Sequence, residues 1–230
     1  MAVDTASAGE ITVVNDAAKR AILSAGSTSS AAVYEMVIAE LTGRQLRAGT
    51  LVDVGCGTGR FFSMVRSMCS RYIGVDIVRY ESFPAEAEFH AVNLDGPRPV
   101  DLPDETADVV LSIETIEHLE NPRALMCELS RLAKPGALLL VTTPNQLTWL
   151  GLLTFVVVYN QFQKVPGLYP AHITHLLEAD MIRIVRECGL RNARIVYSNE
   201  GRVPYTGLHW PGIFRGRRFS YNLMLVAIKP

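Results

Sequence analysis

A glycine-rich turn directly after a short apolar run is the feature that most limits how this chain can fold. The run and the turn read Val52-Asp53-Val54-Gly55-Cys56-Gly57-Thr58-Gly59, with three alternate glycines. Without β-carbons, the backbone can bend sharply and can approach a ligand that a side chain would exclude. A helix is expected next, at residues 59–69. The pattern therefore predicts a strand that turns into a helix, with a ligand at the carboxyl edge of a sheet.

Short apolar runs alternate with segments of helical periodicity along most of the chain. This alternation indicates βαβ units and a mostly parallel sheet. The expected fold class is α/β, with helices on both sides of the sheet. Helices are predicted at residues 29–46, 59–69, 121–134 and 178–188, and strands at 50–54, 72–76, 88–92, 107–112, 137–142, 193–197 and 221–228.

The length and composition of the chain favour one domain and exclude several classes of protein. A chain of 230 residues suits a flexible N-terminal tail at residues 1–28 and a single folded domain at 29–230. The formal net charge of −1 gives no overall positive field for nucleic acid. The most apolar stretch, residues 147–158, is shorter than the ~20 residues that a transmembrane helix needs.

The cysteines and the N-terminal residues indicate a cytoplasmic location. Cys56, Cys69, Cys127 and Cys188 lie far apart and form no C-x-x-C pair, so neither a disulfide framework nor a zinc knuckle is expected. Residues 1–15 lack a basic start followed by an apolar run, so no signal peptide is expected.

An acidic residue at the end of the second predicted strand narrows the choice of ligand for the glycine turn. Asp76 lies where a carboxylate can accept hydrogen bonds from both hydroxyls of an adenosine ribose. A pyrophosphate-binding turn has the spacing G-x-G-x-x-G, but Arg60 stands where its last glycine would be. The spacing here is G-x-G-x-G, so a nicotinamide-binding domain is the alternative and not the first choice.

On these residues the chain resembles the class I S-adenosylmethionine-dependent methyltransferases, over about residues 30–230. The resemblance implies a Rossmann-like seven-stranded sheet whose last strand is antiparallel, and S-adenosylmethionine as the cofactor. It places the methionine end near the glycine turn, the ribose at Asp76 and the adenine near Asn93, where many relatives carry Asp. The cofactor-binding residues that it implies are Asp53, Gly55, Cys56, Gly57, Gly59, Asp76, Ile77, Asn93, Leu94 and Ser112.

A second polar cluster follows the fourth predicted strand. Glu114, Glu117 and His118 have the spacing i, i+3 and i+4, which would put all three on one face of a helix. Two carboxylates and an imidazole beside a methyl donor can hold a divalent cation, which lowers the pKa of an acceptor hydroxyl. A fourth ligand is expected from His172 or His175.

The E-x-x-E-H and H-x-x-H pattern is similar to that of small-RNA 3′-terminal 2′-O-methyltransferases and of ubiquinone-pathway O-methyltransferases. The resemblance implies Mg²⁺ or another divalent cation bound by Glu114, Glu117, His118 and His175, with His172 as the alternative to His175. The aromatic and acidic residues that follow H-x-x-H in the RNA enzymes are absent here, so nucleic acid is not the expected acceptor. A metal-free reaction stays equally open, with His118 as general base and Glu117 and Glu114 as its catalytic partners.

An apolar lid or insertion is expected at about residues 144–176. Trp149, Leu152 and Phe155 are too apolar for a solvated loop, so this segment covers an acceptor site, contacts a membrane surface peripherally, or packs in the core or a dimer interface. The predicted function is O-methylation of a small-molecule, natural-product or lipid-linked acceptor such as a glycolipid. The alternatives are an RNA terminal 2′-O-methyltransferase, a nicotinamide-dependent oxidoreductase and a non-catalytic cofactor-binding protein.

Overall fold

The computed structural model describes residues 30–43, 48–97, 100–158, 172–204 and 206–230. The predicted N-terminal tail and residues 159–171 of the predicted insertion lie outside the described residues.

Within the described residues, seven strands form one sheet in the order β3-β2-β1-β4-β5-β7-β6. The pairs among β1 to β5 are parallel, and β7 is antiparallel to both β5 and β6. The predicted α/β sheet with an antiparallel last strand is therefore confirmed. The strands are β1 Ala48–Val54, β2 Cys69–Asp76, β3 Glu88–Ala91, β4 Ala107–Ile113, β5 Ala133–Pro144, β6 Arg191–Tyr197 and β7 Asn222–Ile228.

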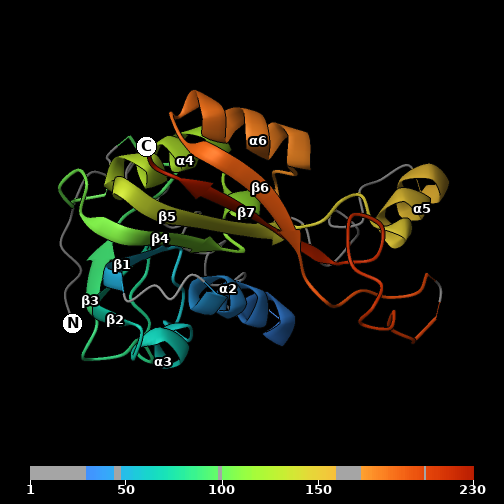
Figure 1. Ribbon diagram of the computed structural model, residues 1–230, viewed down its shortest axis with the longest axis horizontal. Helices are drawn as coiled ribbons and strands as arrows, with labels where there is room; N and C mark the ends of the chain where they lie inside the picture. Colours follow the sequence, from blue (N-terminus) through green and yellow to red (C-terminus); the bar gives the residue numbers. More distant parts are fainter. Residues whose placement is uncertain (1–29, 44–47, 98–99, 159–171, 205) are drawn as a thin grey trace, which may run out of the picture.

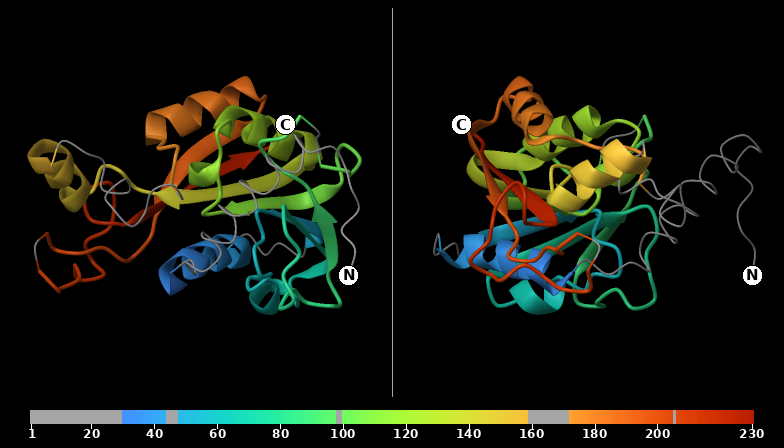
Figure 2. Two further views of the ribbon diagram at one scale, coloured as in Figure 1. Left: turned by 180° about the vertical axis from the view of Figure 1, so that it is seen from behind. Right: turned by 90° about the vertical axis from the view of Figure 1, so that its right-hand side faces the viewer.

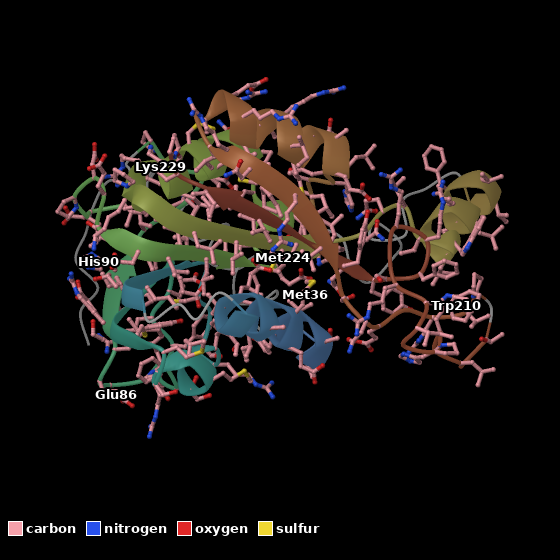
Figure 3. The ribbon with its side chains drawn as sticks, in the orientation of Figure 1. Met36, Glu86, His90, Trp210, Met224 and Lys229 are labelled. Atoms are coloured by element: carbon pink, nitrogen blue, oxygen red, sulfur yellow. A yellow bond between two sulfur atoms is a disulfide. The ribbon has the colours of Figure 1, made fainter. Side chains whose placement is uncertain are left out.

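Helices cover both faces of the sheet, with α2 and α3 on one face and α4 and α6 on the other (Figure 1 and Figure 2). Met36 and Met224 are buried in the apolar layer between α2 and the sheet (Figure 3). Because both faces are covered, the central strands are apolar on both sides. The described helices are α2 Ala31–Gly43, α3 Phe62–Val65, α4 Pro122–Leu132, α5 Trp149–Val158 and α6 Glu178–Glu187, and a 3₁₀ turn, η1, lies at Ile116–His118.

The helix predicted at residues 59–69 is much shorter than expected. It covers only the four residues of α3, and β2 already begins at Cys69. Cys69 and Arg71 pair with Ala48 and Thr50 of β1, and the Arg71 guanidinium donates two hydrogen bonds to Glu88 of β3. Pairing in the sheet therefore begins three residues before the strand predicted at 72–76 and includes Cys69, which was assigned to the helix.

The prediction of four unpaired cysteines is wrong for two of them. Cys127 of α4 and Cys188, the residue after α6, form a disulfide with a Cα–Cα distance of 5.0 Å. The two helices pack side by side on one face of the sheet, which brings together residues that are 61 positions apart. Cys56 and Cys69 remain free thiols.

Candidate functional site

The glycine turn lies between β1 and α3, at the carboxyl edge of the sheet. Gly55, Gly57 and Gly59 all have positive φ, at +84°, +53° and +72°. A β-carbon at Gly55 would overlap the Thr115 side chain, and one at Gly59 would lie 2.6 Å from Pro84. At Gly57, no atom lies within 4 Å of the place a β-carbon would take. The outer glycines therefore allow close packing, whereas the middle one faces open space.

Asp76, at the end of β2, is hydrogen-bonded to this turn. Gly57 N donates to Asp76 Oδ2 at 2.8 Å, and Ile77 N donates to Oδ1 at 2.7 Å. Burial raises the pKa of the Asp76 carboxyl, while these backbone hydrogen bonds and, more weakly, His118 act to lower the pKa. Each carboxylate oxygen has a second lone pair, so the group can still accept hydrogen bonds from ligand hydroxyls. The structure thus brings the predicted glycine turn and the predicted ribose carboxylate together.

The adjacent Asp53 has a protein partner that the sequence did not indicate. Tyr72 Oη donates a hydrogen bond to Asp53 Oδ2 at 2.5 Å, and Oδ1 has no hydrogen-bond partner among the described residues. Burial raises the pKa of Asp53 to about 7, against the lowering effect of the Tyr72 hydroxyl. Burial also raises the pKa of the neighbouring Cys56 thiol.

The other predicted cofactor residues lie at the ends of β3 and β4. Val92 N donates to Asp76 O at 2.9 Å, so the following Asn93 and Leu94 leave the sheet beside Asp76. Asn93 Oδ1 accepts a hydrogen bond from Asp95 N at 3.1 Å. Ser112 is fully buried in β4, and its hydroxyl has no hydrogen-bond partner among the described residues.

The segment after β4 is not the helix that the spacing of Glu114, Glu117 and His118 predicted. Glu114 has a positive φ of +50°, and only the 3₁₀ turn η1 follows it. The Glu114 backbone N–H donates to Thr142 Oγ1 on β5 at 3.0 Å, which holds this kink in place. The three residues therefore do not share one helical face, and that prediction is wrong.

The two glutamates of the cluster have different surroundings. Both oxygens of the Glu114 carboxylate accept hydrogen bonds, from Thr142 Oγ1 at 3.0 Å and from Asn222 Nδ2 at 2.8 Å. Glu117 is 2% exposed and accepts one hydrogen bond, from Thr143 Oγ1 at 3.2 Å, while its Oε1 has no partner among the described residues. Burial raises the pKa of both carboxyls, and the nearby Glu117 raises the pKa of Glu114 further.

The histidine segment before α6 is attached to η1 through its backbone. Ile173 N and Thr174 N both donate to the carbonyl of Glu117, at 3.0 and 2.9 Å. This places the His172 ring edge-on to the His118 ring, with their centroids 4.9 Å apart. Burial lowers the pKa of His172 to about 4, with His118 and His175 adding to the effect, so its imidazole is neutral at pH 7.

Glu117, His118 and His172 form the one group among the described residues whose potential metal-ligand atoms converge. One such atom from each lies within 4.8 Å of the other two. Of the two histidines left open by the sequence, the structure brings His172 into the cluster and leaves His175 outside it. Glu114 also lies outside this group. Its carboxyl oxygens accept hydrogen bonds from Thr142 and Asn222.

Several residues that build this site were missed by reasoning from the sequence. Thr115 packs against Gly55 and so joins the second cluster to the glycine turn. Thr142, Thr143 and Asn222 supply hydrogen bonds to the two glutamates. The one sequence pattern that could have indicated these residues is the polar pair Thr142 and Thr143 after the apolar run of β5.

A family model and the similar sequences indicate one family. A methyltransferase-domain family model matches residues 31–195. A probable S-adenosylmethionine-dependent methyltransferase of Mycolicibacterium smegmatis is 26% identical over 159 residues, which cover 68% of this chain and 56% of that protein. A ubiquinone biosynthesis O-methyltransferase of Maricaulis maris is 26% identical over 103 residues, which cover 42% of this chain and 41% of that protein.

The matches leave much of these relatives uncovered, since the chain spans about half the length of the relatives it matches. Among solved structures, a SAM-dependent methyltransferase from Archaeoglobus fulgidus superimposes with a TM-score of 0.60 at 18% identity, covering 85% of this chain and 94% of that one. The structural likeness shows the same fold.

Proposed function

The chain belongs to the methyltransferase-domain family of S-adenosylmethionine-dependent proteins, and on that premise we propose that it transfers a methyl group from S-adenosylmethionine to a hydroxyl oxygen of its acceptor. The proposed acceptor is a small molecule, a natural product or a glycolipid. One observation carries the proposal: the open glycine turn bonded to Asp76 lies beside a cluster of one buried carboxyl group and two half-buried imidazoles, joined to it by Thr115.

The residues at the glycine turn fit a nucleoside cofactor. The open space at Gly57 admits a ligand that a β-carbon would exclude, and the Asp76 oxygens can accept hydrogen bonds from two ribose hydroxyls. Asn93 and Leu94 flank the same place at the end of β3, where an adenine would lie beside the ribose. When bound, S-adenosylmethionine supplies a methyl group that its sulfonium already makes electrophilic, so positioning and deprotonation of the acceptor remain for the protein.

The second cluster supports deprotonation of the acceptor. His118 accepts the hydroxyl proton as general base, and an oxygen of the Glu117 carboxyl beside it accepts a hydrogen bond from the imidazolium that forms. The buried Glu117 Oε1, which has no partner among the described residues, has a lone pair free for such a contact. The name of the Maricaulis maris relative, an O-methyltransferase, supports oxygen as the methylated atom.

A metal-assisted form of the same reaction is supported by the three convergent groups. Glu117, His118 and His172 offer one carboxylate and two imidazoles, a set that suits Zn²⁺ or Fe²⁺ better than the Mg²⁺ named from the sequence. The buried Nδ1 of His172 has no hydrogen-bond partner among the described residues, as expected of an atom that is available to coordinate a metal ion. A divalent cation there would lower the pKa of the acceptor hydroxyl. Glu114 and His175 as ligands stay predictions.

Calorimetric binding of S-adenosylhomocysteine to the purified chain tests the cofactor site. We expect Gly57→Ala to weaken binding by about tenfold or more, because the new β-carbon fills the open space. Gly136→Ala is the matched control, since Gly136 also has a positive φ and open space but lies toward the other end of β5. Asp76→Ala is expected to weaken binding at least as much. A chain that binds NAD⁺ and not S-adenosylhomocysteine would overturn the proposal in favour of the oxidoreductase.

Transfer of an isotope-labelled methyl group to a panel of phenols, sugars and glycolipids tests the reaction. The label is expected on an acceptor oxygen. Transfer to the 3′-terminal ribose of a short RNA, falling steeply with salt, would support the RNA alternative instead. Binding of the cofactor without transfer to any acceptor would support a non-catalytic protein.

A further inference from the structure

Exposed apolar side chains are concentrated in one part of the molecule. We call this part the apolar head and define it as α5 together with residues 206–219. It projects beyond the carboxyl end of β5, away from the layered body (Figure 1 and Figure 2). Of the nine large exposed apolar residues in the described part of the chain, only Met64 and Leu177 lie elsewhere. The other seven are Trp149 (48% exposed), Phe155 (58%), Val156 (66%), Val157 (57%), Leu208 (68%), Ile213 (86%) and Phe214 (42%).

The two halves of the apolar head are held together by specific contacts. Trp149 N donates to Arg218 O at 2.9 Å, and the Arg218 guanidinium lies 5.6 Å from the centroid of the Trp149 ring and donates to Leu147 O. Trp210, labelled in Figure 3, packs edge-on against Phe219 and at a tilt against Phe214, and the ring centroids of the three residues lie 5.2 to 5.9 Å apart. The exposed apolar groups are therefore displayed on a built surface.

The charges of the apolar head differ from those of the whole chain. Its residues include Arg215, Arg217 and Arg218 and no Asp or Glu, whereas the whole chain has a net charge of −1. Arg217 pairs with Glu178 of α6, but exposed Arg215 has no ion pair among the described residues. A symmetric contact between two copies of this surface would bring arginines against arginines, which disfavours a second copy as its partner.

We propose that the apolar head docks on the surface of a bilayer that contains anionic phospholipid. Aromatic and aliphatic side chains beside arginines are the combination that binds such a surface, with apolar groups below the headgroups and guanidinium groups at the phosphates. None of the helices in the described residues has the length and apolar character to cross a bilayer. With its ten residues, α5 is about 15 Å long and suits a position within the interface.

Docking on a membrane also bears on the chemical class of the methyl acceptor. Thr142 and Thr143 lie at the end of β5 from which the chain continues to the apolar head, and Asn222 begins β7, where the chain returns from it, so the candidate site lies at the end of the sheet nearest the proposed membrane contact. If the proposed function holds, on which this step rests, the arrangement favours a lipid-linked acceptor. The docking itself does not depend on methyl transfer.

Vesicle co-sedimentation of the full chain tests the proposal, with phosphatidylglycerol–phosphatidylcholine vesicles against phosphatidylcholine alone. Both tryptophans of the chain, Trp149 and Trp210, lie in the apolar head, so a blue shift of their emission reports insertion directly. We expect binding to the anionic vesicles that weakens with added salt. Val156→Asp and Ile213→Asp should each lower partitioning by about tenfold or more.

Matched controls separate docking from general changes in charge or stability. Met64→Asp changes an exposed apolar residue outside the apolar head and should bind vesicles like the parent chain. Arg215→Gln should weaken binding severalfold, whereas Arg183→Gln, on the exposed side of α6, should not. The proposal would be overturned if Met64→Asp lost as much vesicle binding as Val156→Asp, or if the parent chain bound neutral and anionic vesicles equally. A dimer in light scattering that Val156→Asp dissociates would also overturn it. Binding of S-adenosylhomocysteine is expected in the parent chain and in all five variants, so a parent chain that docks on vesicles without binding it would count against the proposed function and not against docking.

Discussion

The glycine turn with Asp76 and the Glu117 cluster lie side by side at the sheet edge, but their hydrogen bonds are satisfied to different degrees. At the turn, both Asp76 oxygens accept backbone N–H groups of residues 57 and 77. In the cluster, a buried oxygen of Glu117 and a buried nitrogen of His172 have no partner among the described residues. Buried polar atoms without partners cost free energy. Asp76 is therefore already held by protein hydrogen bonds before a ligand arrives, whereas the Glu117 cluster, like Asp53 Oδ1 beside the turn, keeps buried polar atoms without a protein partner among the described residues.

The largest expected effect comes from removing the Glu117 carboxyl from the incomplete cluster. We expect Glu117→Gln to lower kcat/KM for methyl transfer by about 10³-fold, which is about 4 kcal/mol of transition-state stabilisation. Glu114→Gln is the comparison, because both of its oxygens already accept protein hydrogen bonds, and we expect a loss of about tenfold. Steady-state kinetics with the acceptor identified in the panel measures both. Equal losses would mean that the two glutamates act as one unit, as the spacing in the sequence first suggested.

The next largest effect is expected at Gly55, the glycine of the turn that packs against Thr115. Gly55→Ala should lower the free energy of unfolding by about 3 kcal/mol, because the new β-carbon overlaps Thr115 and because φ is +84°. Gly57→Ala has a positive φ but open space, so we expect a loss of only about 1 kcal/mol. Urea unfolding of both variants makes the comparison. Similar losses would show that backbone strain alone, and not the Thr115 contact, makes glycine necessary at position 55.

The same contrast explains what the sequence could and could not predict. The turn depends on residues that are close in the chain or at the ends of paired strands, so Gly57 and Asp76 were found from spacing alone. The kink at Glu114 depends on Thr142, and the choice of His172 depends on two backbone hydrogen bonds to Glu117. The disulfide likewise depends on how α4 packs beside α6. Local periodicity carries no information on such contacts between distant segments.

The smallest effect is a change in the pH dependence of stability at Asp53, the second carboxylate beside the turn. Its pKa in the folded chain is about 7, above the ordinary value near 3.8, because it is buried. Between these two values the folded state keeps a proton that the unfolded state has lost, so the free energy of unfolding falls as the pH rises from about 4 to about 7. Asp53→Asn cannot ionise, and its amide oxygen can still accept the Tyr72 hydrogen bond.

We therefore expect the stability of Asp53→Asn, relative to the parent chain, to increase by about 2–3 kcal/mol between pH 5 and pH 8. Urea unfolding at the two pH values measures it, and Asp101→Asn, an exposed aspartate, is the control. If the difference between Asp53→Asn and the parent is the same at both pH values, Asp53 is ionised in the folded chain throughout this range. The region of the glycine turn would then contain a buried charge, and it would differ from the Glu117 cluster only in its hydrogen bonding.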